Sequence, residues 1–429
     1  MTTDRTGTTR QSAPDHSGRR QRGLRLLLVL AGLSAASPLA TDMYVPGLPE
    51  VARSLQTDSA GVQVSLTAFL AGVIVGQFVL GPLSDGVGRR PVLLGGTLLF
   101  AAFSIVCGFA PLAVVLDVAR VGQGVAGAAG IVVARAVMTD LFRGVRLAKK
   151  IGTLGAITAL GPVVAPLLGG AVLAVASWRA VFFLLAFFGL ALLVGVLRWV
   201  PESLPRPKRT SGGITGGLRS VGRVATRRTV LAPVLSLSFG GAAVFAYIAG
   251  TSFVFQDIYH QTAGVCSLVY GLNAVGNMAG SLAYGRLVSR WRAERLQTAA
   301  GAVALSGALL LLCVQVTVGS GLWITWGCLF VSITAFGVFF PAVTTVAQSR
   351  GRDAPGATSA LLGSGQFALG AAASPAVGLF GTHSPAPMAA VMTVSLGLAV
   401  MACLACASGS DEPKSIQPKA GRRQGQGSE

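Results

Sequence analysis

Long apolar runs alternate with short polar segments along most of the chain. A bilayer core about 30 Å thick requires about 20 apolar residues in each helix that crosses it. Twelve runs approach or exceed that length, so the pattern predicts twelve membrane-spanning helices. We expect them at residues 24–46, 61–82, 91–109, 112–137, 149–173, 178–200, 231–255, 264–286, 297–317, 321–347, 355–380 and 386–407.

The longest polar connection, residues 201–230, separates the first six spans from the last six and is rich in Pro, Gly, Ser and Arg. Such a composition is typical of a flexible linker. We therefore expect an all-α membrane protein made of two six-helix bundles, residues 24–200 and 231–407. The tails, residues 1–23 and 408–429, are expected to be disordered.

A weak internal repeat supports this division into halves. GPLSDGVGRRP (81–91) follows the second span, and GSLAYGRLVSR (280–290) follows the eighth. The glycines and a leucine recur at equal offsets, whereas Tyr284 stands where the first copy has Asp85. Two related six-helix halves are typical of transporters, whose substrate site lies between the halves near the middle of the membrane.

Composition indicates that lipid is the solvent for this chain. It is 52% hydrophobic and only 11% charged, while an ordinary soluble domain is about a quarter charged. The net charge of +19 could indicate a nucleic-acid partner, but the basic residues crowd into alternate connections and both tails. Such asymmetry marks the cytoplasmic side. We therefore expect a multi-pass protein of the bacterial plasma membrane with both termini in the cytoplasm, and no nucleic-acid partner.

The first span also resembles a secretory signal, because basic residues precede LLLVLAGL and a small-residue stretch, SAAS. The apolar run continues to Val45, which is long enough to cross the membrane, so we favour a retained helix. The basic segment 206–228 is expected to contact anionic lipid.

Patterns for catalysis or metal binding are not apparent. The six cysteines and three histidines are scattered, and Cys403 and Cys406 lie in an apolar run without a second pair of ligands. No phosphate-binding loop and no nucleophile with a base stand out. We therefore expect neither an enzyme nor a metal site.

The glycine-rich connection 81–91 is the most specific motif. Asp85 precedes Arg89 at the spacing of an i,i+4 pair, and Asp140 ends the fourth span nearby. We interpret these residues as a latch between the halves that forms in one conformation and breaks in the other. A solvated loop that only fixes topology is the alternative. The candidate latch residues are Gly81, Asp85, Gly88, Arg89, Arg90 and Asp140.

The fifth span combines two prolines with small residues in GPVVAPLLGG (161–170). Proline removes a backbone hydrogen bond and bends a helix, and glycine permits close packing. We predict a pivot or seal formed by this helix, although membrane helices also tolerate proline without a special role. The candidate pivot residues are Gly161, Pro162, Pro166, Gly169 and Gly170.

Polar residues within the spans are candidates for proton coupling, because charges at membrane depth are costly and usually face the bundle interior. Asp117, Arg120 and Gln123 recur at the spacing of one helical face of the fourth span. Either Asp117 and Arg120 form a structural pair, or Arg120 responds to the protonation of another acid.

Asp42 lies near the far end of the first span, in TDMYVPGLPE (41–50). It either caps the helix end before Pro46 or binds a proton and a substrate in competition, as antiport requires. We favour the second interpretation, with Tyr44 beside it and Asp257 as the counterpart in the second half. Further polar or aromatic candidates for the substrate pocket are Gln77, Gln123, Phe245, Tyr247, Phe253, Gln256 and Asn273.

Several of these motifs resemble those of the major facilitator superfamily. The connection 81–91 is similar to its signature loop, Arg120-Val121-Gly122-Gln123-Gly124 to its second motif, and residues 161–170 to the motif of its proton-coupled exporters. TDMYVPGLP (41–49) and FAYIAGTSFVFQ (245–256) resemble its Bcr/CflA drug-resistance group. Gly86 and Thr139 depart from the usual pattern around the candidate latch.

This resemblance implies a twelve-helix fold, alternating access and exchange of a drug for protons. The expected partners are a small-molecule drug, protons and membrane lipid. No cofactor is expected, since the proton gradient supplies the energy, and we expect a monomer. Export of a natural metabolite, antibiotic or sugar is an alternative within the same class, and a membrane receptor that binds without transport is an alternative from another class.

Overall fold

The structure is a computed structural model that describes residues 16–142, 150, 160–209, 221–317, 319, 321–351, 355–379 and 384–408. These residues are mostly helical, and the described part of the chain contains no strand. The first half contains α1 (His16–Asp42), the 3-10 turn η1 (Val45–Gly47), α2 (Leu48–Ser54), α3 (Ser59–Val87), α4 (Arg89–Gly108), α5 (Ala113–Leu141), α7 (Gly161–Val175), α8 (Trp178–Trp199) and the short turn η2 (Arg206–Lys208).

The second half is built from another series of long helices. It contains α10 (Arg228–Phe253), the π-helical turn η3 (Val254–Ile258), α11 (Ala263–Leu287), α12 (Ala293–Thr317), α13 (Leu322–Arg350), α14 (Pro355–Leu379) and α15 (Ala386–Ser408).

Each predicted span coincides with a helix, so the all-α membrane fold predicted from sequence is confirmed. Nine helices in the described ranges are long and apolar enough to cross a membrane. α7 covers residues 161–175 of the predicted fifth span, and residues 151–159 of that span lie outside the described residues.

α11 and α14 are not among these nine, although each has 25 residues. Both carry polar residues along their length, and both pack against the first half: α11 contacts α7, and α14 contacts α3. A helix that faces protein needs less apolar surface than one that faces lipid on all sides. Their lower hydropathy is therefore explained by their position between the halves.

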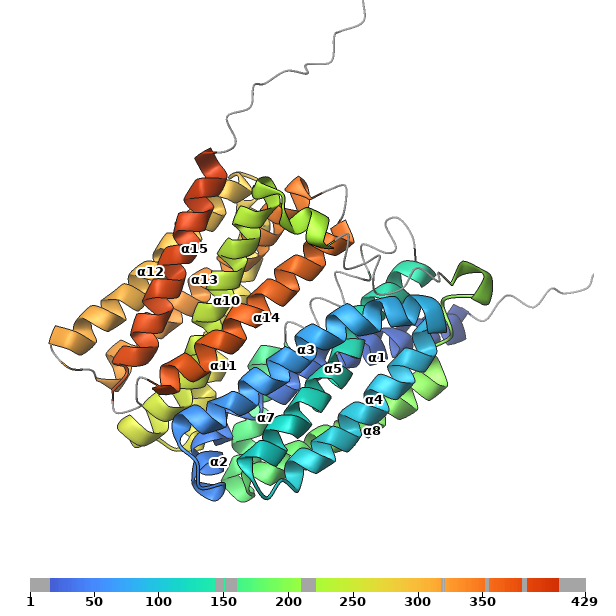
Figure 1. Cartoon of the computed structure of the whole chain (residues 1–429), viewed down its shortest axis with the longest axis horizontal. Coiled ribbons are helices and arrows are strands. Elements are labelled where there is room, and N and C mark those ends of the chain that lie inside the picture. Colours follow the sequence, from blue (N-terminus) through green and yellow to red (C-terminus); the bar gives the residue numbers. More distant parts are fainter. Residues whose placement is uncertain are drawn as a thin grey trace, which may run out of the picture.

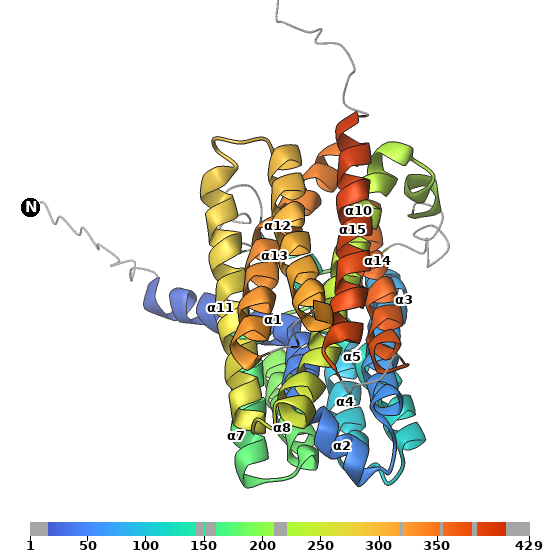
Figure 2. The ribbon, with the colours of Figure 1, turned by 90° about the vertical axis from the view of Figure 1, so that its left-hand side faces the viewer.

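The helices gather in two groups, α1–α8 and α10–α15, with α3 of the first beside α14 of the second (Figure 1). Figure 2 shows the same division after a quarter turn. The end of the molecule that holds α2 also holds the start of α11, and we call it the α2 end. The opposite end holds the connection between α3 and α4, and we call it the Arg89 end.

Close helix contacts repeat in the two halves. A Cβ at Gly124 of α5 would lie 2.1 Å from the carbonyl oxygen of Phe69 in α3. A Cβ at Gly337 of α13 would likewise lie 2.0 Å from the carbonyl oxygen of Asn277 in α11. Only glycine permits such an approach of two backbones in membrane helices. The weak sequence repeat thus corresponds to an equivalent pairing of helices.

Two boundaries differ from those predicted. α1 begins at His16, within the segment expected to be a disordered tail, because a helix already nucleated by its apolar part extends at little cost through residues without proline. The predicted linker 201–230 contains η2, helical residues 221–225 and the start of α10 at Arg228. Residues 1–15, 210–220 and 409–429 lie outside the described residues.

Candidate functional site

Arg120 is fully buried in α5 and joins three helices. Its Nη1 donates hydrogen bonds to the carbonyl oxygen of Ala40 in α1 at 3.0 Å and to Oε1 of Gln123 at 2.8 Å. Nε2 of Gln123 in turn donates to Oγ of Ser104 in α4 at 2.7 Å. Arg120 and Gln123, which were predicted to share a helix face, therefore act as one connected group.

Aromatic rings surround the guanidinium group. Its Cζ lies 4.2 Å from the ring centre of Phe69, 4.9 Å from that of Tyr44 and 5.7 Å from that of Phe182. A desolvated cation over an aromatic face gains about 2 kcal/mol. Arg120 is thus held by a cage of rings from α3, α8 and the turn that follows α1.

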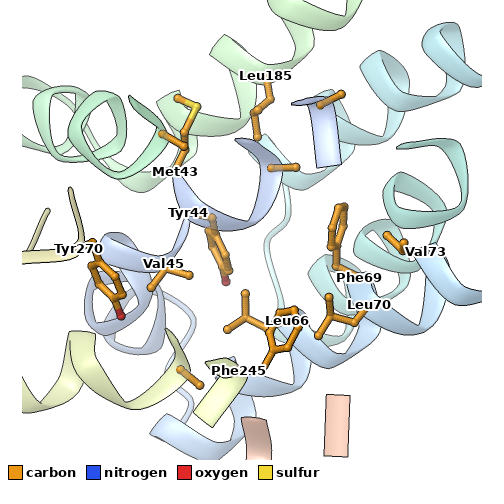
Figure 3. Packing of buried hydrophobic residues seen from close by; sticks show 14 of the residues in the cluster. Met43, Tyr44, Val45, Leu66, Phe69, Leu70, Val73, Leu185, Phe245 and Tyr270 are labelled. Atoms are coloured by element: carbon orange, nitrogen blue, oxygen red, sulfur yellow. The ribbon is translucent and has the colours of Figure 1, made fainter. Parts of the chain in front are cut away.

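The ring of Tyr44 is fixed by its hydroxyl group. The Ser65 hydroxyl donates to the carbonyl oxygen of Val62 at 2.6 Å, so in the 2.9 Å contact between the two hydroxyls Tyr44 is the donor. Figure 3 shows Tyr44 lying between Tyr270 on one side and Phe69 on the other. Tyr44 therefore belongs to the cage around Arg120 and directly precedes η1, which contacts α10 and α11 of the second half.

Asp117 does not pair with Arg120. No ion pair of Arg120 is formed among the described residues, and Oδ1 of Asp117 is buried without a hydrogen-bond partner. Nε and Nη2 of Arg120 likewise lack partners. The side chain of Arg120 instead reaches α1 and the aromatic rings. A direct salt bridge between Asp117 and Arg120 is therefore not formed, although the two charges lie within electrostatic range of each other.

Asp42 is the last residue of α1 and is half-buried. Across the described residues it makes no hydrogen bond or ion pair, and it lies within electrostatic range of Tyr247 in α10 of the second half. A side-chain cap at this helix end is not formed. Asp42 is thus placed toward the second half, and its role beside a substrate pocket stays a prediction.

A polar and aromatic network faces Asp42 from the second half. Nδ2 of Asn273 donates to the Tyr247 hydroxyl at 2.9 Å, and Nε1 of Trp326 donates to Oδ1 of Asn273 at 3.2 Å. The rings of Tyr247 and Tyr270 stand edge to face with centres 5.4 Å apart. Aromatic walls with a few fixed polar groups are typical of small-molecule sites. Of these residues, Trp326 and Tyr270 were not predicted.

The remaining pocket candidates are spread along the interface between the halves. Gln77 of α3 lies beside Gly363 of α14, where a Cβ would be 3.1 Å from Oε1 of Gln77. Phe245 stacks on Phe367 of α14 with ring centres 6.0 Å apart. Phe253 is buried at the end of α10.

Asp257 lies in η3 at the α2 end, and its Oδ1 is 3.9 Å from Nη1 of Arg53. It lines a cavity of about 390 Å³ together with Pro46, Glu50, Arg53, Leu173, Gln256, Gln261, Thr262 and Ala263. Asp257 is therefore at the rim of the molecule and not beside Asp42, as a central coupling role would require.

The candidate latch forms a compact cluster at the Arg89 end. Arg89 is buried, with Nη1 2.7 Å from Oδ1 of Asp85 and Nε 3.1 Å from Oδ2 of Asp140. Its Nη1 also donates to Oγ of Ser84 at 2.6 Å, and Ser203 donates to Asp140 at 2.8 Å. Every one of these partners belongs to the first half, whereas we expected the cluster between the halves. The cause is that α4 packs on α5 and α8 of its own half.

Gly88 and Arg90 complete this cluster through the backbone. Gly88 has a φ of 117°, a conformation that favours glycine, and α4 begins directly after it. Glu202, which follows α8, accepts from the backbone N–H groups of Arg89 at 3.0 Å and Arg90 at 3.3 Å. The Arg90 side chain turns away and donates to the carbonyl oxygen of Leu197 at 2.7 Å. Glu202 thus caps α4, a role that sequence analysis missed.

Gly81 and Tyr284 show how the two copies of the repeat differ. The carbonyl oxygen of Gly81 accepts from the Ser84 hydroxyl at 2.7 Å. At the position that matches Asp85 in the second half, Tyr284 of α11 donates to Oγ1 of Thr345 in α13 at 2.8 Å. A neutral hydrogen bond therefore stands where the first half has an ion-pair cluster.

The glycine pair of α7 contacts both halves. A Cβ at Gly169 would lie 2.3 Å from the carbonyl oxygen of Met43, and one at Gly170 would lie 2.2 Å from Oγ of Ser267 in α11. Pro166 is buried inside the helix, and Gly161 and Pro162 form its first turn. This arrangement is compatible with the predicted seal or pivot.

The family model of the major facilitator superfamily matches residues 30–375 of the chain. The chain belongs to the major facilitator superfamily. This superfamily consists of membrane transporters, so the protein is placed among transporters and not among enzymes. The resemblance inferred from the motifs is thereby confirmed.

Curated members of the superfamily are similar over most of the chain. An uncharacterized MFS-type transporter, YdgK of Bacillus subtilis, is 34% identical over 382 residues, which are 89% of this chain and 94% of the relative. The bicyclomycin resistance protein homolog of Haemophilus influenzae is 28% identical over 386 residues, 88% of this chain and 94% of the relative. The similarity therefore extends through both halves.

A solved superfamily structure shows the same fold. The xylose transporter XylE of E. coli, in a partially occluded inward open conformation, superposes with a TM-score of 0.71 at 13% identity. The match covers 92% of this chain and all of that one. At this identity the likeness concerns the fold alone.

Proposed function

We propose that the protein exports small amphipathic drugs across the bacterial plasma membrane in exchange for protons. The observation that carries this proposal is a set of charges inside the first half without direct compensation: Arg120, Asp117 and Asp42. Charges within a membrane bundle are costly and are retained for transport of ions or substrates. The similarity to a bicyclomycin resistance protein homolog supports a drug as the exported compound.

In the proposed cycle, Asp42 binds either a proton or a cationic or polar group of the substrate. A protonated Asp42 removes a charge from the interface and allows the halves to change their tilt. A charged Asp42 attracts the substrate into the space that Tyr247 and Asn273 border. Because both ligands compete for one carboxylate, uptake of protons drives release of the drug.

Arg120 keeps a positive charge inside the first half throughout the cycle. Its hydrogen bond to the carbonyl oxygen of Ala40, two residues before Asp42 along α1, connects it mechanically to that helix end. A change of charge at Asp42 that shifts the end of α1 is therefore expected to move Arg120 as well.

The distribution of basic residues sets the membrane orientation that we propose. We place the Arg89 end and both termini in the cytoplasm, and the α2 end outside. No cofactor is required, and a monomer suffices because both halves of the pocket come from one chain.

The test uses everted membrane vesicles with a preformed proton gradient, monitored by a fluorescent pH probe, and bicyclomycin as the first compound. Addition of bicyclomycin is expected to dissipate the gradient. Asp42→Asn should lower this proton flux at least tenfold while binding of the compound persists. Equal transport with and without a gradient would exclude antiport. Unchanged coupling in Asp42→Asn would exclude Asp42, and Asp117→Asn is the next variant to examine.

A further inference from the structure

Two hydrogen bonds to a single backbone turn join the halves at the α2 end. The Ser252 hydroxyl of α10 donates to the carbonyl oxygen of Val45 at 2.6 Å. Nε2 of Gln256 in η3 donates to the carbonyl oxygen of Pro46 at 2.8 Å. Both acceptors belong to η1, which directly follows the segment that contains Asp42 and Tyr44. Further along α3, Gln63 donates to the carbonyl oxygen of Ala249 at 3.4 Å and Thr67 to that of Ala371 at 2.7 Å.

The contact between Ser252 and Val45 is shielded from solvent, since their exposed fractions are 0% and 1%. The carbonyl oxygen of Val45 also accepts from the backbone N–H of Leu48, and an oxygen with two lone pairs can accept both bonds. In a buried place, loss of the Ser252 bond leaves part of this acceptor unsatisfied unless water enters. The bond therefore favours a state in which the halves stay together here.

The π-helical turn at the end of α10 brings two successive residues toward the first half. Gln256 reaches Pro46, and Asp257 lies 3.9 Å from Arg53. Single π-helical turns are rare and occur often at functional sites. The wider turn is the local feature that lets α10 end against η1 instead of continuing as an α-helix.

The hydrogen bonds outweigh the ion pair in this contact. The side chains of Arg53 and Asp257 are 71% and 40% exposed, and exposed pairs at such separations contribute little. The bond from Ser252 is short and buried, and that from Gln256 is half-buried. Closure should therefore depend on Ser252 and Gln256 much more than on Arg53.

A cavity of about 390 Å³ lies directly beside this contact and is lined by both halves. Glu50, Arg53 and Leu173 come from the first half, and Gln256, Asp257 and Gln261 from the second. Separation of the halves at the α2 end would widen this cavity into a passage toward the buried interface. Pro46 and Gln256, which share one of the hydrogen bonds to η1, both line this cavity.

We propose that Ser252 and Gln256, with the carbonyl groups of Val45 and Pro46, form the gate that closes the α2 end and opens when the halves separate there. The inference rests on the alternating-access part of the proposed function. It assigns the closing contact to side-chain donors of the second half and backbone acceptors of the first, and it makes the Arg53–Asp257 pair a minor contributor.

The experiment measures the separation of the halves without any substrate. Nitroxide labels are placed at Gln56→Cys and Val265→Cys, in a chain with Cys313 and Cys406 replaced by serine, and distances are measured by double electron–electron resonance in liposomes. Gln56 and Val265 are exposed and belong to different halves. The labels report a closed and a separated population of the α2 end.

Ser252→Ala and Gln256→Ala are each expected to raise the ratio of separated to closed molecules about fivefold, the effect of one lost hydrogen bond. Arg53→Ala should change the ratio less than twofold. Gln256→Glu, which replaces the donor by an acceptor facing a carbonyl oxygen, should act in the same direction as Gln256→Ala and serves if the alanine variant does not fold.

Ser332→Ala is the matched control, because the buried Ser332 hydroxyl donates to the carbonyl oxygen of Ala304 within the second half. It should leave the label distances unchanged. An unchanged distribution in folded Ser252→Ala and Gln256→Ala, or an equal shift in Ser332→Ala, would overturn the gate. If the labels respond as expected but no proton-coupled export is found, the gate stands and the proposed function fails.

Discussion

At the scale of single residues, two buried arginines are accommodated in different ways. Arg89 lies against two carboxylates, whereas Arg120 is held by a carbonyl group, an amide and three aromatic rings. Because Arg89 is paired directly with carboxylates, its charge serves to hold the structure together. The second remains available to respond to other charges, which is why we assign the coupling role to the region of Arg120.

Asp140 and Asp85 both contact Arg89 but differ in exposure, 20% against 46%. Because exposed pairs contribute little and shielded hydrogen bonds to charged groups contribute more, Asp140→Ala should lower the free energy of unfolding by about 2 kcal/mol. Asp85→Ala should lower it by less than about 1 kcal/mol. Titration with SDS in mixed micelles measures both values, and equal losses would contradict the ranking by exposure.

Asp85 and Arg89 are four residues apart and meet across the turn at Gly88 that separates α3 from α4. Their closeness along the chain therefore made a contact predictable. The capping by Glu202 was not predictable in this way. Glu202 is far from Arg89 along the chain, and only the packing of α8 against α4 brings its carboxylate to the first turn of α4.

At the scale of elements, α7 is notable because its two adjacent glycines pack against different halves of the molecule. Gly169 faces backbone of the first half, whereas Gly170 faces the side chain of Ser267 in the second. Backbone cannot move aside, but a side chain can be removed by substitution. The two glycines therefore predict different responses to the same change.

Gly169→Ala and Gly170→Ala should each lower the free energy of unfolding by about 2 kcal/mol through overpacking. In a Ser267→Gly background, Gly170→Ala should cost less than half of that value, because its clashing partner is gone. Gly169→Ala should cost the same in either background. A double-mutant cycle in mixed micelles measures these differences, and equal rescue of both variants would argue against the assigned contacts.

At the scale of the whole molecule, the distribution of basic residues predicts the orientation in the membrane. Arg53 and Arg179 are at the α2 end, and most other basic residues lie in the tails and in the segments of the Arg89 end. Since basic connections stay in the cytoplasm, the α2 end should face outward.

Labelling of introduced cysteines in intact cells, with Cys313 and Cys406 replaced by serine, tests this orientation. The other four native cysteines are buried. A membrane-impermeant maleimide should label Gln56→Cys at once and Ser289→Cys only after the cells are permeabilised. Both positions are exposed and lie at opposite ends of the helices. Labelling of Ser289→Cys from outside would reverse the assignment of the two faces.

The sequence by itself determined the all-α membrane class, the position of each span and the similarity of the two halves. These properties follow from the thickness of the bilayer and from local hydrophobicity, so neighbouring residues suffice to specify them. The tertiary structure alone decided that Arg120 is caged by rings, that the Arg89 cluster is confined to one half, and that Ser252 and Gln256 bind η1. Each of these contacts joins residues distant along the chain, and their distances depend on how helices pack, which no local pattern encodes.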